Sequence, residues 1–295
     1  MASLTKAFHK EPYPAISPSL PSLSQATKTV LITGGSTGIG YAIARAFASA
    51  SASLVVILGR RPDLVCSAAS RLTAELPGFK GKIVGRPCDI SDSSSVAVLW
   101  SDLEKEGIVV DVLVLNAAHT SNPGPILQLG QDEVWADYIM NVRANLDLVE
   151  RFSKQNERTP NGKKKSIINL STMAIHNFAI AGSRPNYTAT KNAGTLLLQQ
   201  IARDTPVEKI QIISFHPGLI LTEGNRRIGL DEKSAPWDDE NLPGHFAIWA
   251  ASPDAAFLHG RFVWANWDVD ELRTGELRER IDNDPDYLKV GVKGL

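Results

Sequence analysis

The sequence contains little cysteine, no long apolar run and almost no net charge. Cys66 and Cys88 are its only cysteines, and they do not form a short-spaced metal or redox motif. We therefore expect free thiols in a reducing compartment. No apolar run approaches the roughly 20 residues that span a bilayer, and the N-terminus lacks the continuous apolar stretch of a signal peptide. These absences predict a cytoplasmic protein with no membrane partner and no metal site.

The charges are balanced, with 31 Lys and Arg against 32 Asp and Glu and a formal net charge of −1. This balance gives no electrostatic reason to expect nucleic acid or an anionic membrane as a partner. Hydrophobic residues make up 43% and charged residues 21% of the chain, which is ordinary globular usage and allows a sizeable core. The length of 295 residues fits one large α/β domain or two small ones, and no linker divides it.

Short β-branched runs alternate with longer amphipathic stretches, which is the pattern of βαβ units and a parallel sheet. Strands are expected at Thr29–Thr33, Leu54–Leu58, Lys82–Gly85, Val110–Asn116, Ser166–Leu170, Gln211–Phe215 and Arg261–Ala265. Helices are expected at Gly38–Ala50, Pro62–Leu76, Ser93–Glu106, Asp132–Asn156 and from the region of Tyr187 to Arg203. We predict one α/β domain over residues 28–295, with a doubly wound parallel sheet of about seven strands flanked by helices.

Two segments fall outside this pattern. Residues 1–27 carry Pro12, Pro14, Pro18 and Pro21, and we expect an irregular arm that lies over the domain or is partly disordered. The segment Thr222–Leu242 is rich in Gly, Asp, Glu and Arg. Its composition suits either a mobile lid near a substrate site or an ordinary surface connection.

A glycine-rich turn follows the first expected strand and precedes the first expected helix. It reads Thr33-Gly34-Gly35-Ser36-Thr37-Gly38-Ile39-Gly40. Glycines in this context permit a tight turn, close approach to a pyrophosphate and close packing of helix on strand. The helix N-terminus would then offer N–H groups to the phosphates. The alternative is a glycine-rich connection with no ligand.

The spacing T-G-x-x-x-G-x-G resembles that of the classical short-chain dehydrogenase/reductase family. Further matches follow in the family's order: Asp89, Asn116-Ala117-Ala118, Asn141, Asn169-Leu170-Ser171-Thr172, Tyr187 with Lys191, and Pro217-Gly218-Leu219-Ile220 with Thr222. The resemblance covers Thr29 to Ala265 and implies a Rossmann-like fold. The Pro-rich arm and the tail Phe262–Trp267 are most similar to fungal members.

The end of the second expected strand indicates which cofactor is used. It reads Leu58-Gly59-Arg60-Arg61 and lacks the acidic residue that would hold the ribose hydroxyls of NAD. A guanidinium can instead bind a 2′-phosphate bidentately. We therefore predict NADP(H), with Arg60 on the phosphate, Arg61 in support and a possible contact from the Ser36 hydroxyl. Both arginines could otherwise be solvated surface charges.

The resemblance assigns further cofactor contacts. Asp89 would meet the adenine edge, Asn116 would fix the turn beside the adenosine ribose, and Ile220 and Thr222 would meet the nicotinamide carboxamide. Without the resemblance, Asp89 could be a helix cap and Thr222 a turn residue. The complete predicted cofactor set is Gly34, Ser36, Thr37, Gly38, Ile39, Gly40, Arg60, Arg61, Asp89, Asn116, Ala117, Tyr187, Lys191, Pro217, Ile220 and Thr222.

Tyr187 and Lys191 stand four residues apart, so on a helix they share a face. A free tyrosine has a pKa near 10, and a cation beside it favours the phenolate and lowers that pKa. The resemblance implies that Lys191 also binds the nicotinamide ribose and that Asn141 holds a water that relays protons to Lys191.

The family's serine lies three residues after the asparagine of the fifth strand, where this chain has Thr172. Neighbouring strand side chains point to opposite faces, so only one of Ser171 and Thr172 can face the site. We predict that Thr172 faces the site and that its hydroxyl holds the substrate oxygen as charge develops. Ser171 is the alternative.

The expected activity is NADPH-dependent reduction of a ketone or aldehyde to an alcohol, or the reverse, with Tyr187 as the proton donor or acceptor. The alternatives are isomerisation, dehydration or cyclisation on the same fold, and a non-catalytic NADP(H) sensor. The partner would be a small carbonyl or alcohol substrate. The family's habit of pairing through long helices implies a homodimer or homotetramer. His119 and His176 flank the expected site, but neither shows a partner in the sequence and neither is assigned a role.

Overall fold

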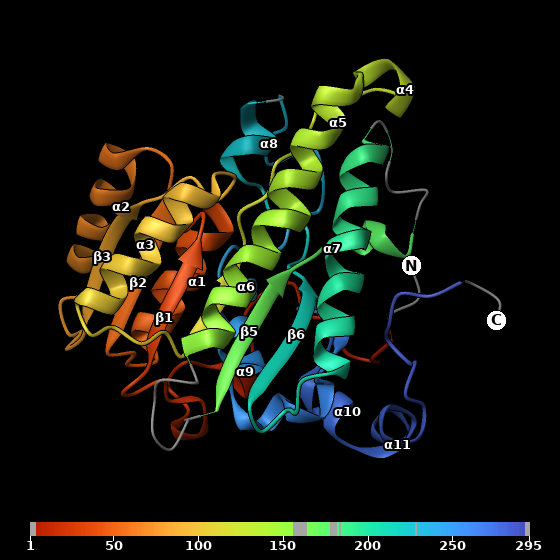
Figure 1. Ribbon diagram of the computed structural model, residues 1–295. Coiled ribbons are helices and arrows are strands. Elements are labelled where there is room, and N and C mark those ends of the chain that lie inside the picture. Colours follow the sequence, from red (N-terminus) through yellow and green to blue (C-terminus); the bar gives the residue numbers. More distant parts are fainter. Residues whose placement is uncertain (1–3, 156–163, 178–181, 183, 228, 293–295) are drawn as a thin grey trace.

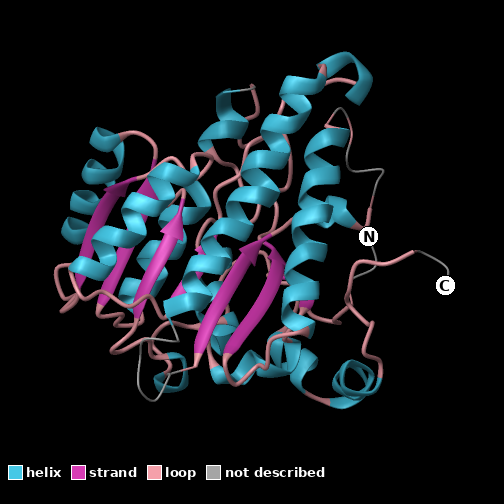
Figure 2. Cartoon of the chain, viewed as in Figure 1, coloured by secondary structure: helices cyan, strands magenta, loops and turns pink. Residues whose placement is uncertain are grey.

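Seven parallel strands form a single sheet in the order β3-β2-β1-β4-β5-β6-β7, in a computed structural model that describes residues 4–155, 164–177, 182, 184–227 and 229–292. The strands are β1 (Thr29–Thr33), β2 (Leu54–Gly59), β3 (Lys82–Pro87), β4 (Val112–Leu115), β5 (Lys165–Leu170), β6 (Ile210–His216) and β7 (Arg261–Trp264). The order reverses between β1 and β4, where ligands bind in sheets of this kind. The doubly wound α/β prediction is confirmed (Figure 2).

The helices are α1 (Gly38–Ser49), α2 (Pro62–Glu75), α3 (Ser93–Lys105), α4 (Ile126–Leu129), α5 (Gln131–Tyr138), α6 (Ala144–Lys154), α7 (Pro185–Arg203), α8 (Glu223–Arg227), α9 (Leu242–Ala250), α10 (Val269–Arg273) and α11 (Gly275–Asn283). Short 3-10 turns occur at Pro14–Ile16, Pro21–Leu23, Met173–Ile175 and Pro253–Leu258. In Figure 1, α4, the upper end of α5 and α8 lie beyond the carboxyl ends of the strands.

The sheet is buried on both faces, and the alternation of side chains along each strand produces two cores. Val30 and Ile32 of β1 belong to a core that includes α1, α2 and α9. Leu31, between them, belongs to a second core with α3, α6 and α7. This arrangement explains why the central strands read as continuous apolar runs, and it holds their carboxyl ends at one rigid edge.

The long helix expected over Asp132–Asn156 is present, but it is not uniform. A π-helical turn at Ile139–Arg143 separates α5 from α6, and the expected last residue, Asn156, lies outside the described residues. The side chain of Asn145 donates to the Asn141 carbonyl at 2.9 Å, within this turn. Single π turns inside α-helices are frequent at functional sites, and this one holds a predicted catalytic residue.

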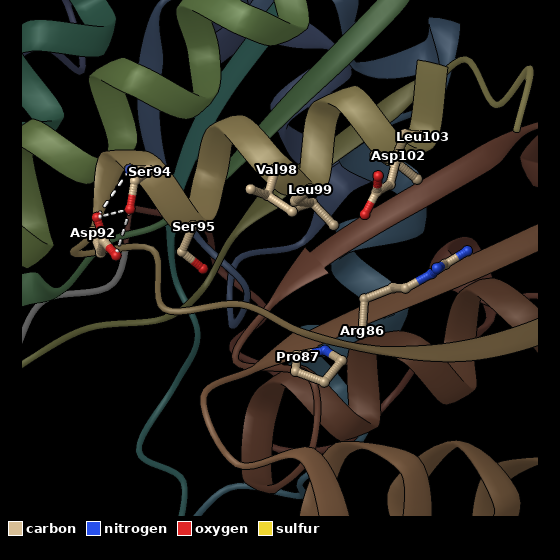
Figure 3. Close-up of a pocket in the computed structure, with 9 residues that line it drawn as sticks. All are labelled: Arg86, Pro87, Asp92, Ser94, Ser95, Val98, Leu99, Asp102 and Leu103. Carbon is tan, nitrogen blue, oxygen red and sulfur yellow. Dashed lines mark hydrogen bonds between the residues drawn. The ribbon is translucent and has the colours of Figure 1, made fainter. Parts of the chain in front are cut away.

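An open cavity of about 380 Å³ lies between the edge strand β3 and α3 (Figure 3). Arg86 and Pro87 line one wall, and Ser95, Leu99 and Leu103 line the other. Its lining residues belong only to β3, to α3 and to the turn before α3, and none of the predicted site residues lines it. We assign it no part in the site described below.

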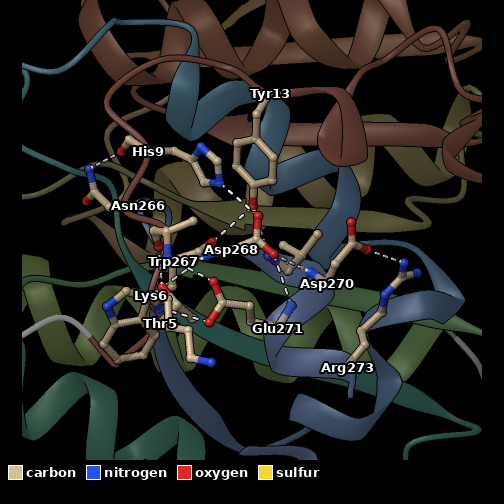
Figure 4. Close-up of polar contacts among 12 residues, drawn as sticks. Thr5, Lys6, His9, Tyr13, Asn266, Trp267, Asp268, Asp270, Glu271 and Arg273 are labelled. Atoms are coloured by element: carbon tan, nitrogen blue, oxygen red, sulfur yellow. Dashed lines mark hydrogen bonds and ion pairs between the residues drawn. The ribbon is translucent and has the colours of Figure 1, made fainter. Parts of the chain in front are cut away.

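The N-terminal arm is irregular, and its residues Thr5, Lys6, His9 and Tyr13 lie against the C-terminal part of the chain (Figure 4). Phe8 pairs with Trp267 in an isolated antiparallel bridge. The Tyr13 hydroxyl donates to the Trp267 carbonyl at 2.9 Å and accepts from Val269 N–H at 3.1 Å. Ile16 is fully buried in the first core. The arm therefore contributes to the core and covers the end of β7.

The segment between β6 and α9 is anchored at its C-terminal end. The Asp238 carboxylate accepts from Leu219 N–H at 2.7 Å and from the Asn266 amide at 2.9 Å. Asp239 N–H donates to the Lys10 carbonyl at 2.7 Å, so this segment joins the turn after β6 to the N-terminal arm. Its N-terminal half forms the short helix α8.

Two searches of the described residues gave negative results. None of the described helices is both long and apolar enough to cross a bilayer. Among the same residues, no group of three or more His, Cys, Asp or Glu side chains could hold a metal ion.

Candidate active site

The glycine-rich turn connects β1 to α1 at the point where the strand order reverses. Gly34 and Gly38 have φ of +65° and +53°, a backbone conformation that side chains with a Cβ disfavour. A Cβ on Gly40 would lie 2.3 Å from the Gly34 carbonyl oxygen. Thr37 precedes α1 without capping it, so no side chain competes for the first N–H groups of the helix. This tight cradle fits a dinucleotide pyrophosphate.

Thr33 and Asn116 tie the cradle to β4. Asn116 Nδ2 donates to the carbonyls of Thr33 at 2.9 Å and Gly34 at 3.2 Å. The Thr33 hydroxyl accepts from the N–H groups of Asn116 and Ala117 at 2.9 and 3.0 Å. Asn116 therefore holds the turn after β1 against the end of β4. The resemblance implied that Asn116 fixes a turn, and the position of this turn beside an adenosine ribose stays a prediction.

Ser36 and the arginines lie at the end of β2. The Ser36 hydroxyl would be 3.4 Å from a Cβ on Gly59, which places it against the last residue of the strand. Arg60 and Arg61 follow directly, and both are exposed. Neither guanidinium forms an ion pair or side-chain hydrogen bond with the described residues. One hydroxyl and two exposed cations therefore occur at the end of β2, which is the position where we predict that the adenosine ribose binds.

Asp89 has a turn-forming role after β3. Its Oδ1 accepts from the Ser91 N–H at 3.0 Å and from the Ser91 hydroxyl at 2.6 Å. The cap of α3 is Asp92, which accepts from Ser94 N–H at 2.9 Å. The helix-cap alternative for Asp89 is therefore wrong, and its contact with an adenine stays a prediction.

The turn after β6 reaches back to the cradle. Pro217 and Ile220 are buried. The side chain of Thr222 lies 3.6 Å from the position of a Cβ on Gly38. Its hydroxyl also donates to Asn225 Oδ1 at the start of α8. Thr222 is thus both a turn residue and a wall of the predicted cofactor site.

Tyr187 and Lys191 lie on α7. Burial, followed by the Asp137 carboxylate, raises the pKa of Tyr187 to about 12, while Arg184 opposes this rise. Burial alone lowers the pKa of Lys191 to about 8. The Lys191 ammonium donates to the Leu170 carbonyl at 2.5 Å. The sequence predicted a lowered pKa for Tyr187, and the net shift here is upward, because burial and the Asp137 carboxylate together outweigh Arg184.

Ser171 and Thr172 have different environments. Ser171 is buried, with its hydroxyl 2.6 Å from that of Thr195 on α7. Thr172 is partly exposed and begins the 3-10 turn Met173–Ile175, where its hydroxyl accepts from Ala174 N–H at 3.3 Å. Of the two hydroxyl-bearing residues after β5, Thr172 is therefore the more exposed.

Asn141 is 1% exposed and connects three elements. Its Oδ1 accepts from His119 N–H at 2.9 Å, and its Nδ2 donates to the His119 carbonyl and to the Thr190 hydroxyl, each at 2.9 Å. The side chain therefore holds the loop after β4 against α7. It lies within a helix irregularity, and protein groups use both Nδ2 hydrogens and one lone pair of Oδ1. The water relay stays a prediction.

Sequence reasoning missed one constellation at this site. His119 Nδ1 lies 2.6 Å from Asp137 Oδ1, and Asp137 is completely buried. The histidine had no evident partner in the sequence because 18 residues and an irregular loop separate the pair.

Comparisons with known proteins agree with this geometry. A model of the family described as short chain dehydrogenase matches residues 28–233. The chain is 34% identical to short chain dehydrogenase/reductase AacuD of Aspergillus aculeatus, covering 98% of this chain and 96% of the relative. It is 35% identical to a short chain dehydrogenase/reductase of Claviceps purpurea, covering 90% and 86%. Both relatives are fungal, in line with the sequence resemblance.

Solved structures share the fold. A putative NAD(P)-dependent gluconate 5-dehydrogenase from Beutenbergia cavernae, with bound NADP at low occupancy, superposes with a TM-score of 0.73 at 22% identity, covering 86% of this chain and all of that one. A 7α-hydroxysteroid dehydrogenase complexed with NADH and 7-oxo glycochenodeoxycholic acid gives 0.70 at 24% identity, covering 86% and 97%. The chain therefore belongs to the short chain dehydrogenase/reductase family of oxidoreductases.

Proposed function

We propose that this protein is an NADP(H)-dependent carbonyl reductase that converts a ketone or aldehyde to an alcohol, or catalyses the reverse reaction. The observation that carries the proposal is that Tyr187 and the buried Lys191 lie one turn apart on α7, with the partly exposed Thr172 after the end of β5. The phenol of Tyr187 keeps its proton at neutral pH, as an unperturbed tyrosine also does. A protonated phenol one helical turn before a buried lysine is suited to protonating an alkoxide.

Each predicted site residue has a separate role in this reaction. When bound in the glycine cradle, the nicotinamide cofactor supplies the hydride. The hydroxyls of Thr172 and Tyr187 would hold the substrate oxygen, and Tyr187 would give it a proton as negative charge develops. Lys191 would contribute positive charge beneath the site, and Asn141 would keep the loop after β4 and helix α7 in register.

NADP(H) is preferred in this proposal because the two residues directly after β2 are arginines, where an NAD enzyme would have a carboxylate. Ser36 lies against the end of β2, and Arg60 and Arg61 are exposed directly after it. A 2′-phosphate at this position would gain charge-assisted hydrogen bonds, whereas an acidic residue there would repel it.

The test is consumption of NADPH, followed at 340 nm, with a panel of ketones and aldehydes. We expect turnover by the native protein and none by Tyr187→Phe, with NADPH affinity retained in the variant. Product without loss of NADPH would indicate isomerisation, dehydration or cyclisation instead. Tight NADPH binding without any product would indicate a sensor. Full activity of Tyr187→Phe would refute the assigned proton donor.

We also propose a homodimer or homotetramer. Trp135, Leu146 and Leu196, on α5, α6 and α7, are exposed by 54%, 43% and 38%. Large apolar side chains on the outer faces of these successive helices favour a partner surface. Light scattering of the purified protein would measure the assembly, and a monomer at micromolar concentration would refute it.

A further inference from the structure

His119 and Asp137 form an oriented pair whose second ring nitrogen is uncommitted. Asp137 is 0% exposed, and its Oδ1 lies 2.6 Å from His119 Nδ1. A carboxylate can only accept, so the proton of the neutral imidazole sits on Nδ1 and Nε2 keeps its lone pair. Nε2 has no hydrogen-bond partner within the described part of the chain. The side chain is 40% exposed, so this nitrogen is accessible.

The same carboxylate connects the histidine to the proton donor. Asp137 Oδ2 accepts from Asn186 Nδ2 at 2.8 Å, and Asn186 immediately precedes Tyr187. It also accepts from Ser121 N–H at 3.2 Å, which fixes the loop that carries His119. Asp137 is close enough to Tyr187 to raise the pKa of its phenol. One buried carboxylate therefore orients the His119 ring and bonds the residue that precedes Tyr187.

The backbone of His119 is fixed as firmly as its ring. Asn141 bonds both the N–H and the carbonyl of His119 at 2.9 Å. Asn141 also bonds Thr190, whose hydroxyl donates to the Tyr187 carbonyl at 2.9 Å. These bonds fix the backbone of residue 119 relative to Tyr187, and the bond to Asp137 fixes the orientation of its ring.

We propose that His119, aligned by Asp137, is a specificity residue that accepts a hydrogen bond from a hydroxyl group of the substrate, at a position away from the carbonyl that reacts. The proposal rests on the carbonyl reductase function above and narrows its substrates to hydroxylated ketones. Sites built to bond a substrate hydroxyl discriminate strongly against analogues that lack it, because a buried or oriented polar group is otherwise left unpaired. The O-methyl ether of such a ketone keeps the oxygen but loses the donor.

The experiment measures binding separately from turnover. The protein is saturated with NADP⁺, which permits no reduction, and titrated calorimetrically with 2-, 3- and 4-hydroxyacetophenone and with their methyl ethers. For at least one positional pair we expect the hydroxy ketone to bind about tenfold more tightly than its ether. In His119→Phe, which keeps a flat ring, the two constants should agree within about twofold.

Asp137→Asn separates alignment from mere packing. The amide of asparagine can donate to Nδ1 and so favour the tautomer with the proton on Nε2, which removes the acceptor without removing the ring. We expect the preference to fall as it does in His119→Phe. The matched control is His9→Phe, which removes an imidazole–carboxylate pair of 2.8 Å with Asp268 in the N-terminal arm and should keep the preference.

Equal binding of every pair by the native protein, absence of binding, or a preference that survives in His119→Phe would each overturn the inference. NADPH consumption with the same ketones is then measured independently. Selective binding without reduction would leave His119 as a recognition residue and refute the reductase function. Reduction with no preference for hydroxylated ketones would support the reductase function and refute the role assigned to His119.

Discussion

The Ser171 hydroxyl donates its hydrogen bond to the Thr195 hydroxyl on α7. The two oxygens lie 2.6 Å apart, and the Thr195 hydroxyl in turn donates to the Lys191 carbonyl at 2.8 Å. Because the proton of Thr195 is used within α7, the proton between the two residues comes from Ser171. Ser171 therefore holds the end of β5 against α7, and we predict that the Thr172 hydroxyl is the one that bonds a substrate.

Replacing Thr172 by alanine should lower kcat by about 100-fold, as loss of a donor to a developing oxyanion does. Thr172→Ser should keep most of the activity because it keeps the hydroxyl. Ser171→Ala should instead lower the free energy of unfolding by about 1 kcal/mol and change kcat little. Steady-state kinetics and urea denaturation distinguish the two positions. A larger loss of kcat in Ser171→Ala than in Thr172→Ala would reverse the assignment.

Arg60→Ala should weaken NADPH binding by about 10- to 100-fold, in the range of a lost hydrogen bond to a charged group. NADH has no 2′-phosphate, so its affinity should change little. Fluorescence titration with both cofactors measures the difference. Arg203→Ala, which removes an exposed arginine paired with Asp204, is the control. Equal losses for NADPH and NADH would remove Arg60 from the phosphate site.

Lys191 should make stability depend on pH in a defined direction. Its pKa is about 8 in the folded protein and 10.5 as the unperturbed value. Below pH 8 it is charged in both states, and its burial reduces stability in full. Between pH 8 and 10.5 the unfolded chain binds the additional proton, so the free energy of unfolding rises with pH.

Lys191→Met removes this dependence. The stability of the variant relative to the native protein should therefore decrease by about 2–3 kcal/mol between pH 7 and 10.5. Urea denaturation across this range measures it, with Lys209→Met at an exposed position as control. Native and Lys191→Met curves that stay parallel would contradict the assigned burial effect. Lys165, which burial also affects, contributes equally to all three proteins and cancels.

The sheet was predictable because each strand carries its own signal. The apolar runs at Val30–Ile32 and Val112–Leu115 are local, and both faces of the sheet are buried, so periodicity and composition sufficed. The helix α9 was not predicted, since all but one of its residues are buried and it has no polar face to mark a 3.6-residue period. Gly244 lets it approach α1: a Cβ there would lie 2.7 Å from the Ala42 carbonyl.

The sequence likewise predicted some parts of the site and missed others. Residues with a fixed place in a local pattern, such as Asn116 and Thr222, lie beside the glycine cradle as the sequence indicated. The pairing of His119 with Asp137 depends on the π turn and on the loop after β4, neither of which has a local sequence rule. The direction of the pKa shift of Tyr187 was missed for a similar reason: spacing reports that Lys191 is near, but not how deeply the phenol is buried.

Tyr13 should be important for stability although it lies far in sequence from the domain that it covers. Its hydroxyl bonds the Trp267 carbonyl and Val269 N–H, and Tyr13→Phe would leave both backbone groups buried without that partner. We expect the free energy of unfolding to fall by about 1–3 kcal/mol, measured by urea denaturation. Tyr138→Phe is the control, since the Tyr138 hydroxyl bonds none of the described residues. Unchanged stability would show that the arm's hydrogen bonds are replaced by water at no cost.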